Sequence, residues 1–173
     1  ENDSEIDNVR FKFWSEFYEK LKEKSNIYLS TAPKPRTYIS VSAGMRGVNY
    51  ICGAQNNSAQ VEIYIDRGKE DGKETNLKIF REFEKNKEQI EKNFGNKLDW
   101  EDLPESRACR IALRSNLGGF QDEDTWEDIH NFLVDHLIKL EKEFNLKKEK
   151  YLKVQGAMEA LTLVETGNTD TDK

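Results

Sequence analysis

Histidine, cysteine and proline are scarce in this chain of 173 residues, which contains two histidines, two cysteines and three prolines. The cysteines, Cys52 and Cys109, stand far apart without the paired spacing of a zinc site, and each lies in an apolar, strand-like run. We therefore predict buried, reduced thiols, as is typical of proteins in a reducing compartment. The histidines, His130 and His136, are six residues apart on one predicted helix and so point to different sides of it. This spacing favours neither a nucleophile–base pair nor a metal site, and we predict no catalytic residue, no cofactor and no metal ion.

Long apolar runs are also absent, since no stretch approaches the roughly 18 residues of a membrane-spanning helix. The first residues, ENDSEID, lack the basic flank and apolar centre of a secretory signal. These two absences predict a cytoplasmic protein without a membrane partner. Basic residues do not dominate, because 27 Lys and Arg stand against 33 Asp and Glu, a net charge of −6. Each contact with a phosphate backbone needs a cation, so this balance does not indicate nucleic-acid binding, although a local basic face stays open as an alternative.

The apolar residues that are present recur with two periods, and the combination predicts an α+β fold. Helical spacing marks residues 8–25, 76–94, a long C-terminal helix from about Thr125, and a further helical piece over 147–164. Alternation of apolar and polar residues marks strands near 38–42, 48–52, 60–65, 98–103 and 107–113. We predict the order helix, three-strand antiparallel meander, helix, two strands and long C-terminal helix, with the helices covering one face of the sheet. Residues 1–165 then form a single α+β domain, and residues 166–173 form a disordered tail.

Six segments, in order and spacing, resemble a known family. They are the aromatic first helix with FWSEFYEKL, the strand VEIYID, the helix end KEQIEKNFG, the strand LDWEDL, the arginine-bearing strand ESRACRIAL and the last helix start DEDTWEDI. Over roughly residues 10–145 the chain resembles the uncharacterised bacterial and archaeal family called domain of unknown function 4268. Members of that family occur alone or behind nuclease-like domains of prokaryotic defence and restriction proteins. The resemblance therefore implies a noncatalytic interaction or accessory domain in that setting, with a protein partner or a neighbouring domain, and it implies no catalytic residues.

The order of helices and strands also matches the core of restriction endonucleases, so we tested that interpretation at the residues. Those nucleases hold magnesium with an acid on the second strand and with an acid-x-Lys motif on the third. Here the second strand, VNYIC, has no acid, and the third has Glu62-Ile63-Tyr64, with tyrosine in place of the lysine. The nuclease interpretation survives only as an alternative, a divergent nuclease-like domain without an intact active site.

The best candidates for binding are arginines of the last predicted strand. Arg110 and Arg114 fall on one strand face, and with Arg107 they can meet an acidic partner or phosphates. Trp100 is a further candidate, for stacking on a ligand, against the alternative of core packing. Glu62 and Tyr64 complete the candidate residues.

Two other classes of function stay open. Small acidic chaperones of type III secretion share this order of helices and strands, which offers the alternative of a homodimer that binds an extended polypeptide; this likeness is one of topology alone. An enzyme of another type would need a deep pocket that gathers Glu62, Tyr64 and Asp66 with Arg110. An enzyme is therefore the less favoured of these alternatives.

Overall fold

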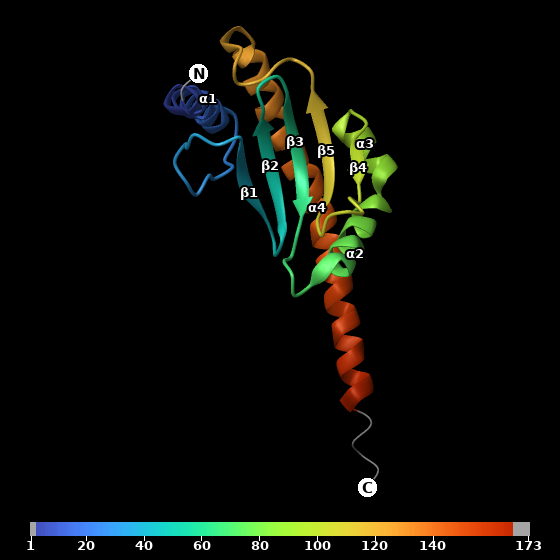
Figure 1. Ribbon diagram of the computed structural model, residues 1–173. Helices are drawn as coiled ribbons and strands as arrows, with labels where there is room; N and C mark the ends of the chain where they lie inside the picture. The colour runs from blue at the N-terminus through green and yellow to red at the C-terminus, as the bar shows by residue number, and fades with distance from the viewer. Residues whose placement is uncertain (1–2, 168–173) are drawn as a thin grey trace.

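The computed structural model describes the backbone of residues 3–167 and the side chains of residues 3–145, with a few on later turns (Figure 1). Its elements follow in the predicted order. They are α1 (Asp3–Lys24), β1 (Tyr38–Met45), β2 (Val48–Ala54), β3 (Ala59–Ile65), α2 (Gly72–Glu84), α3 (Lys87–Phe94), β4 (Asp99–Glu101), β5 (Cys109–Ser115), the 3-10 turn η1 (Glu123–Thr125) and α4 (Trp126–Gly167). The predicted α+β class, including the three-strand meander, is thereby confirmed.

The five strands form one sheet in the order β1-β2-β3-β5-β4, and each neighbouring pair is antiparallel. Short hairpins join β1 to β2 and β2 to β3. The turn between β1 and β2 contains Gly47, whose φ of 75° lies in the left-handed region that glycine tolerates best. The chain then leaves the sheet through α2 and α3 and returns as β4 at the edge. β5 fills the place between β4 and β3 (Figure 1).

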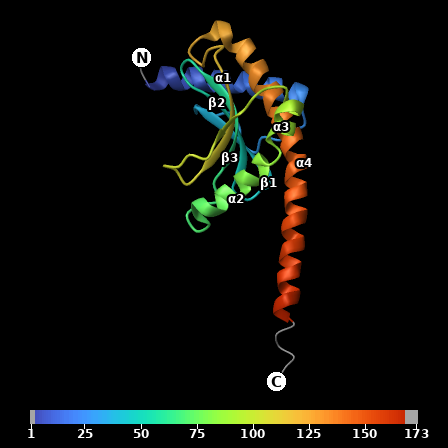
Figure 2. The same ribbon diagram turned by 90° about the vertical axis from the view of Figure 1, so that its right-hand side faces the viewer.

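The helices cover one face of this sheet, as predicted, because the apolar residues of each strand alternate onto that face. On β3, Val61, Ile63 and Ile65 are fully buried under the helices. On α4, Leu133, Leu137 and the other buried residues of the stripe recur every three or four positions, so the helix lies along the sheet. α1 packs on α4, and the last part of α4 projects beyond the sheet (Figures 1 and 2).

The predicted helix over 76–94 is two helices, which is a correction. α2 ends at Glu84 and α3 begins at Lys87, with a tight turn in which the Asn86 N–H donates to the Phe83 carbonyl at 3.0 Å. The apolar stripe explains the break. Phe83 and Ile90 are buried, but the positions three and four residues after Phe83 are Asn86 and Lys87, so a continuous helix has a polar gap on its inner face. The turn falls at this gap, and Ile90 on α3 is buried in the core. Gly95 ends α3 with a φ of 86°, as the sequence indicates.

Other boundaries differ more modestly. α1 begins at Asp3, earlier than predicted, with acids in the first turn where the helix dipole favours them. β4 is shorter than the predicted strand over 98–103, and β5 is shifted by two residues from 107–113. The predicted helical piece over 147–164 is a continuation of α4, which runs through Gly167. Residues 166 and 167 of the expected tail are therefore helical, and residues 168–173 lie outside the described part of the chain.

Cys52 and Cys109 are free, buried thiols, as predicted. None of the helices in the described part of the chain has the length and apolar character needed to cross a lipid bilayer.

Candidate functional site

The second face of the sheet carries the polar halves of the alternating strands, and no described helix covers it. We call it the open face. Strand register decides which residues meet there. Glu62 on β3 stands opposite Ala112 on β5, and Tyr64 stands opposite Arg110. Four of the predicted binding residues, Glu62, Tyr64, Arg110 and Arg114, therefore share this face, because β5 pairs directly with β3.

Charged side chains cross the open face from β3 through β5 to β4, in a row that we call the charge ladder. Arg110 Nε lies 2.7 Å from Glu62 Oε2, and Arg110 Nη1 lies 3.6 Å from Glu101 Oε2. Arg114 Nη1 lies 2.8 Å from Glu101 Oε1 and 2.7 Å from Asp99 Oδ2. Both arginines are thus paired with carboxylates of neighbouring strands. The two arginines and three carboxylates of the ladder have a net formal charge of −1, which does not favour phosphate binding.

Glu62 is the most buried member of the ladder, with 5% of its surface exposed. Its Oε2 accepts a hydrogen bond from Gln60 Nε2 at 2.8 Å. The contact with Arg110 has ion-pair distance, but the Nε–H does not point along it, so this nitrogen makes no hydrogen bond. Burial raises the pKa of Glu62 above its ordinary value of 4.5, and the positive charges of Arg110 and Arg114 offset only part of that rise.

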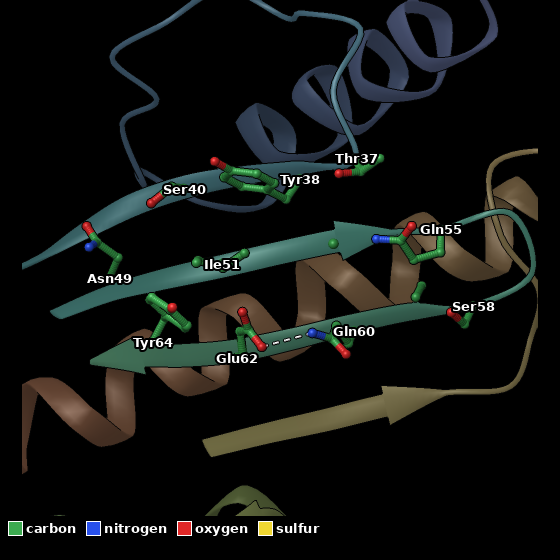
Figure 3. A pocket seen from close by; sticks show the side chains of 12 residues that line it. Thr37, Tyr38, Ser40, Asn49, Ile51, Gln55, Ser58, Gln60, Glu62 and Tyr64 are labelled. Atoms are coloured by element: carbon green, nitrogen blue, oxygen red, sulfur yellow. Dashed lines mark hydrogen bonds between the residues drawn. The ribbon is translucent and has the colours of Figure 1, made fainter. Parts of the chain in front are cut away.

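A hollow of about 520 Å³ lies beside Glu62, between β1 and β3 over the middle of β2 (Figure 3). Its volume falls in the range of about 300–1,000 Å³ that is usual for ligand sites. The sides carry hydroxyl and amide groups, and the floor is formed by β2. Residues that line it include Tyr38, Ser40, Asn49, Ile51, Gly53, Gln60, Glu62 and Tyr64. The hollow therefore combines a buried carboxylate, neutral polar groups and apolar surface, which suits recognition of a polar ligand.

Arg107 does not take part in the charge ladder. Its guanidinium binds Asp66 through two contacts of 2.7 Å, Nε to Oδ1 and Nη2 to Oδ2. These hydrogen bonds, first from Arg107 and also from Gly68 N–H and Asn76, lower the pKa of Asp66 although burial opposes them. Arg107 and Asp66 therefore join the start of β5 to the end of β3. Of the four residues named for an enzyme pocket, Glu62 and Tyr64 line the hollow described above, and Asp66 and Arg110 do not.

Trp100 lies on the helix-covered side of the sheet. Its ring packs edge-on against Phe80 at 6.0 Å, and its Nε1 donates to Glu91 Oε1 at 3.2 Å. The Glu91 carboxylate also accepts from Leu98 N–H at 3.0 Å and from Lys97 Nζ at 2.8 Å. Burial raises the pKa of Glu91, but these three donors outweigh it and hold the pKa below the ordinary value. Trp100 and Glu91 together attach β4 to α3.

Among the residues that line the hollow, sequence reasoning named Glu62 and Tyr64 and passed over the others, including Asn49, Ile51 and Gly53 on β2. The signal was weak, because on β2 the alternation is blurred by an apolar Ile51 and a glycine on the polar side. The polar alternation of Ser40 and Gln60 on the flanking strands was the stronger signal for this face.

The histidines lie on the other side of the sheet. His130 is 2% exposed and packs against Phe13, with ring centroids 4.4 Å apart. His136 contacts Phe94 and Phe132, and its Nδ1 lies 2.7 Å from the Phe132 carbonyl. Within the ranges whose side chains the structure describes, no group of three or more His, Cys, Asp or Glu is placed to hold a metal ion.

The fold and the open face define a two-layer α+β protein whose sheet presents one face to solvent. The family model described as Domain of unknown function (DUF4268) matches residues 9–147, and the chain belongs to this family. The resemblance found in the sequence is thereby confirmed. No curated protein and no solved structure matches the chain.

Proposed function

We propose that this protein is a noncatalytic interaction domain that binds an extended polypeptide of a partner protein on the open face of its sheet. The single observation that supports this most is the hollow beside the buried Glu62 on a face that no described helix covers. A concave, mixed polar and apolar surface of this kind suits side chains of a peptide. We further propose the setting that the family resemblance implies, an accessory role in prokaryotic nuclease or defence proteins.

A polypeptide is favoured over a nucleic acid by the charges. Open antiparallel sheets also bind single-stranded RNA, through exposed aromatic rings and unpaired cations. Tyr38 supplies an exposed ring, but Arg110 and Arg114 are paired with Glu62, Glu101 and Asp99. A phosphate backbone would have to displace those carboxylates. A peptide needs no such rearrangement.

The edge strand β1 supports the same proposal. Among the described elements, β1 pairs only with β2, and although the loop over 29–36 flanks its first residues, its outer edge carries backbone N–H and C=O groups that an added strand could pair with. A peptide that adds to this edge would place alternate side chains above the open face, next to Tyr38 and Ser40. The chaperone-like alternative uses the same edge or face in a homodimer.

A peptide-display selection tests the proposal. Peptides enriched on the wild-type protein are measured by calorimetry against Ile51→Lys, which changes the floor of the hollow. The matched control is Phe11→Lys, an apolar residue 50% exposed on α1, on the helix side. We expect affinity to fall about tenfold or more in Ile51→Lys and to be unchanged in Phe11→Lys.

Two results would overturn the proposal. One is the absence of any enriched peptide, or equal affinity for both variants. The other is tight binding of labelled single-stranded RNA or DNA that weakens steeply with salt and is lost in Arg114→Glu, since this would make the face a nucleic-acid site. Light scattering of the peptide complex gives the oligomeric state, and a dimer that binds one peptide per pair would replace the accessory-domain setting with the chaperone-like one.

A further inference from the structure

Gly53, near the end of β2, leaves one position in the floor of the hollow without a side chain. Gly53 faces the open side between its two strand-pairing partners, Tyr38 on β1 and Gln60 on β3. Glycine within a strand weakens the strand, and such glycines often mark a place where a ligand or another backbone approaches closely. The presence of glycine at position 53 of a strand therefore needs a physical explanation.

The backbone does not require glycine at this position. Gly53 is not among the residues with positive φ. A Cβ built there would lie 3.6 Å from Gln60 Cγ and 3.8 Å from the Thr37 carbonyl oxygen, which are ordinary van der Waals contacts. Gly47, by contrast, has both a positive φ and a Cβ position that overlaps Arg67. What the absence of a side chain at Gly53 provides is space beside its β3 partner Gln60, in the same hollow that Glu62 lines.

The Glu62 carboxylate borders this space with one oxygen uncommitted. Its contacts with Gln60 Nε2 and with Arg110 Nε both involve Oε2. Figure 3 shows the second oxygen directed toward Ile51, away from Gln60. A carboxylate that is 5% exposed and short of donors gains most from a charged donor, because such hydrogen bonds are about twice as strong as neutral ones.

We infer that the hollow receives a basic side chain, arginine or lysine, of the extended segment that the open face binds. The inference rests on the proposed function and names its ligand chemistry. The cation donates to Glu62 Oε1, and its aliphatic stem lies over Gly53 and the apolar surface of Ile51. The rings of Tyr38 on β1 and Tyr64 on β3 stand on opposite sides of the hollow and offer apolar surface to the aliphatic stem (Figure 3).

The neighbouring charges agree with a cationic ligand. Arg110 and Arg114, the cations nearest to Glu62, are each held by Glu101, and Asp99 adds a further carboxylate. Gln60, Asn49 and Ser40 are neutral and line the remaining wall. Glu62 is the single formal charge in the lining, so a negative ligand would find no cation inside the hollow to pair with.

The test uses a small probe so that it does not depend on a peptide partner. Nα-acetyl-arginine N-methylamide is titrated into the full chain, and amide chemical shifts are followed by two-dimensional NMR. The neutral control probe is the citrulline analogue, which has nearly the same shape without the charge. We expect saturable shifts on β2 and β3 with the arginine probe, and affinity about tenfold or more lower with the citrulline probe.

Two variants locate the site. Glu62→Gln removes the charge with little change of shape, and Gly53→Val fills the hollow with a residue that favours strands. Each is expected to weaken the arginine probe about tenfold or more. Glu74→Gln, an exposed carboxylate on α2 outside the hollow, is the matched control and is expected to bind the probe as the wild type does. If one variant fails to fold, the other decides.

The outcomes separate this inference from the proposed function. The inference alone is overturned if the arginine and citrulline probes bind equally well. It is also overturned if Glu62→Gln or Gly53→Val binds the arginine probe as tightly as the wild type does, or if the enriched peptides lack a basic residue. Selective binding of the arginine probe without any enriched peptide overturns the polypeptide proposal and leaves a small cationic ligand. Binding of a short single-stranded RNA that displaces the arginine probe overturns both.

Discussion

The buried His130 gives a prediction whose size follows from its surroundings. The imidazole is 2% exposed and packs between Phe13 and Phe17 of α1 and Trp126 of α4. Burial is the main reason that its pKa falls from 6.5 to about 4; the positive charge of Lys20 lowers it further, and a hydrogen bond with the Phe13 backbone raises it slightly. His130 is therefore neutral in the folded protein at pH values where it is protonated in the unfolded chain.

The sign of the effect on stability follows from linkage. Between pH 6.5 and about 4 the unfolded state binds the proton and the folded state does not, so falling pH favours unfolding. Above pH 6.5 the penalty is absent, and below about pH 4 it is fully developed. With these two values, the contribution of His130 lowers the free energy of unfolding by about 2 kcal/mol between roughly pH 7 and pH 5.

The change that tests this is His130→Leu, which keeps an apolar side chain of similar size and removes the titration. Urea unfolding at several pH values gives the free energy of unfolding of both proteins. We expect the difference between variant and wild type to grow by about 2 kcal/mol in favour of the variant as pH falls from about 7 to about 5. Phe17→Leu is the control. It disturbs the same contact without a titrating group and is expected to cost about 1 kcal/mol at every pH.

A difference between His130→Leu and the wild type that stays constant from about pH 7 to about pH 5 would refute the reasoning. It would mean that His130 is protonated equally well in the folded state, through solvent access or an acceptor beyond the Phe13 backbone. A change of the opposite sign would show that the imidazolium is stabilised by folding.

Two further predictions concern the stability of the fold. Gly47→Ala is expected to lower the free energy of unfolding by about 1–3 kcal/mol, because φ at Gly47 is 75° and the new Cβ would lie 2.5 Å from Arg67 Cγ. A Cβ at Gly53 would make only ordinary contacts, so Gly53→Ala is expected to stay within about 0.5 kcal/mol of the wild type in the same urea assay. Asn76→Ala is expected to cost about 2–4 kcal/mol by thermal or urea unfolding, because the fully buried amide accepts from Arg67 N–H and donates to the Arg107 carbonyl, each at 3.0 Å. Equal stability of Gly47→Ala and Gly53→Ala, or an unchanged Asn76→Ala, would contradict these expectations.

The fold was predictable where local pattern determines it. Alternation in β3 placed Val61 and Ile63 on the covered face and Glu62 on the other, and the structure confirms this. The helical stripes of α1 and α4 were equally readable. The break between α2 and α3 was missed because helical propensity continues through Lys85, and because Phe83 and Ile90, seven residues apart, share one face of a continuous helix.

The candidate residues show where local pattern stops being informative. Trp100 and Arg110 both belong to strands, yet one packs under α3 and the other lies on the open face, which depends on strand pairing. Arg107 stands outside β5 and forms a pair with Asp66 across 41 residues of sequence. The spacing of residues within one strand does not predict such a contact.

The sequence by itself determined that this chain forms a two-faced sheet, with amphipathic helices on its apolar side, because the periods of two and 3.6 residues are properties of neighbouring residues. The tertiary structure alone decided that β5 lies beside β3, bringing Arg110 to Glu62, and that the hollow over β2 borders that carboxylate. Strand order depends on how the helices pack over the whole sheet, and an empty volume is defined only by the side chains around it. Both are relations between distant residues, which no local pattern contains.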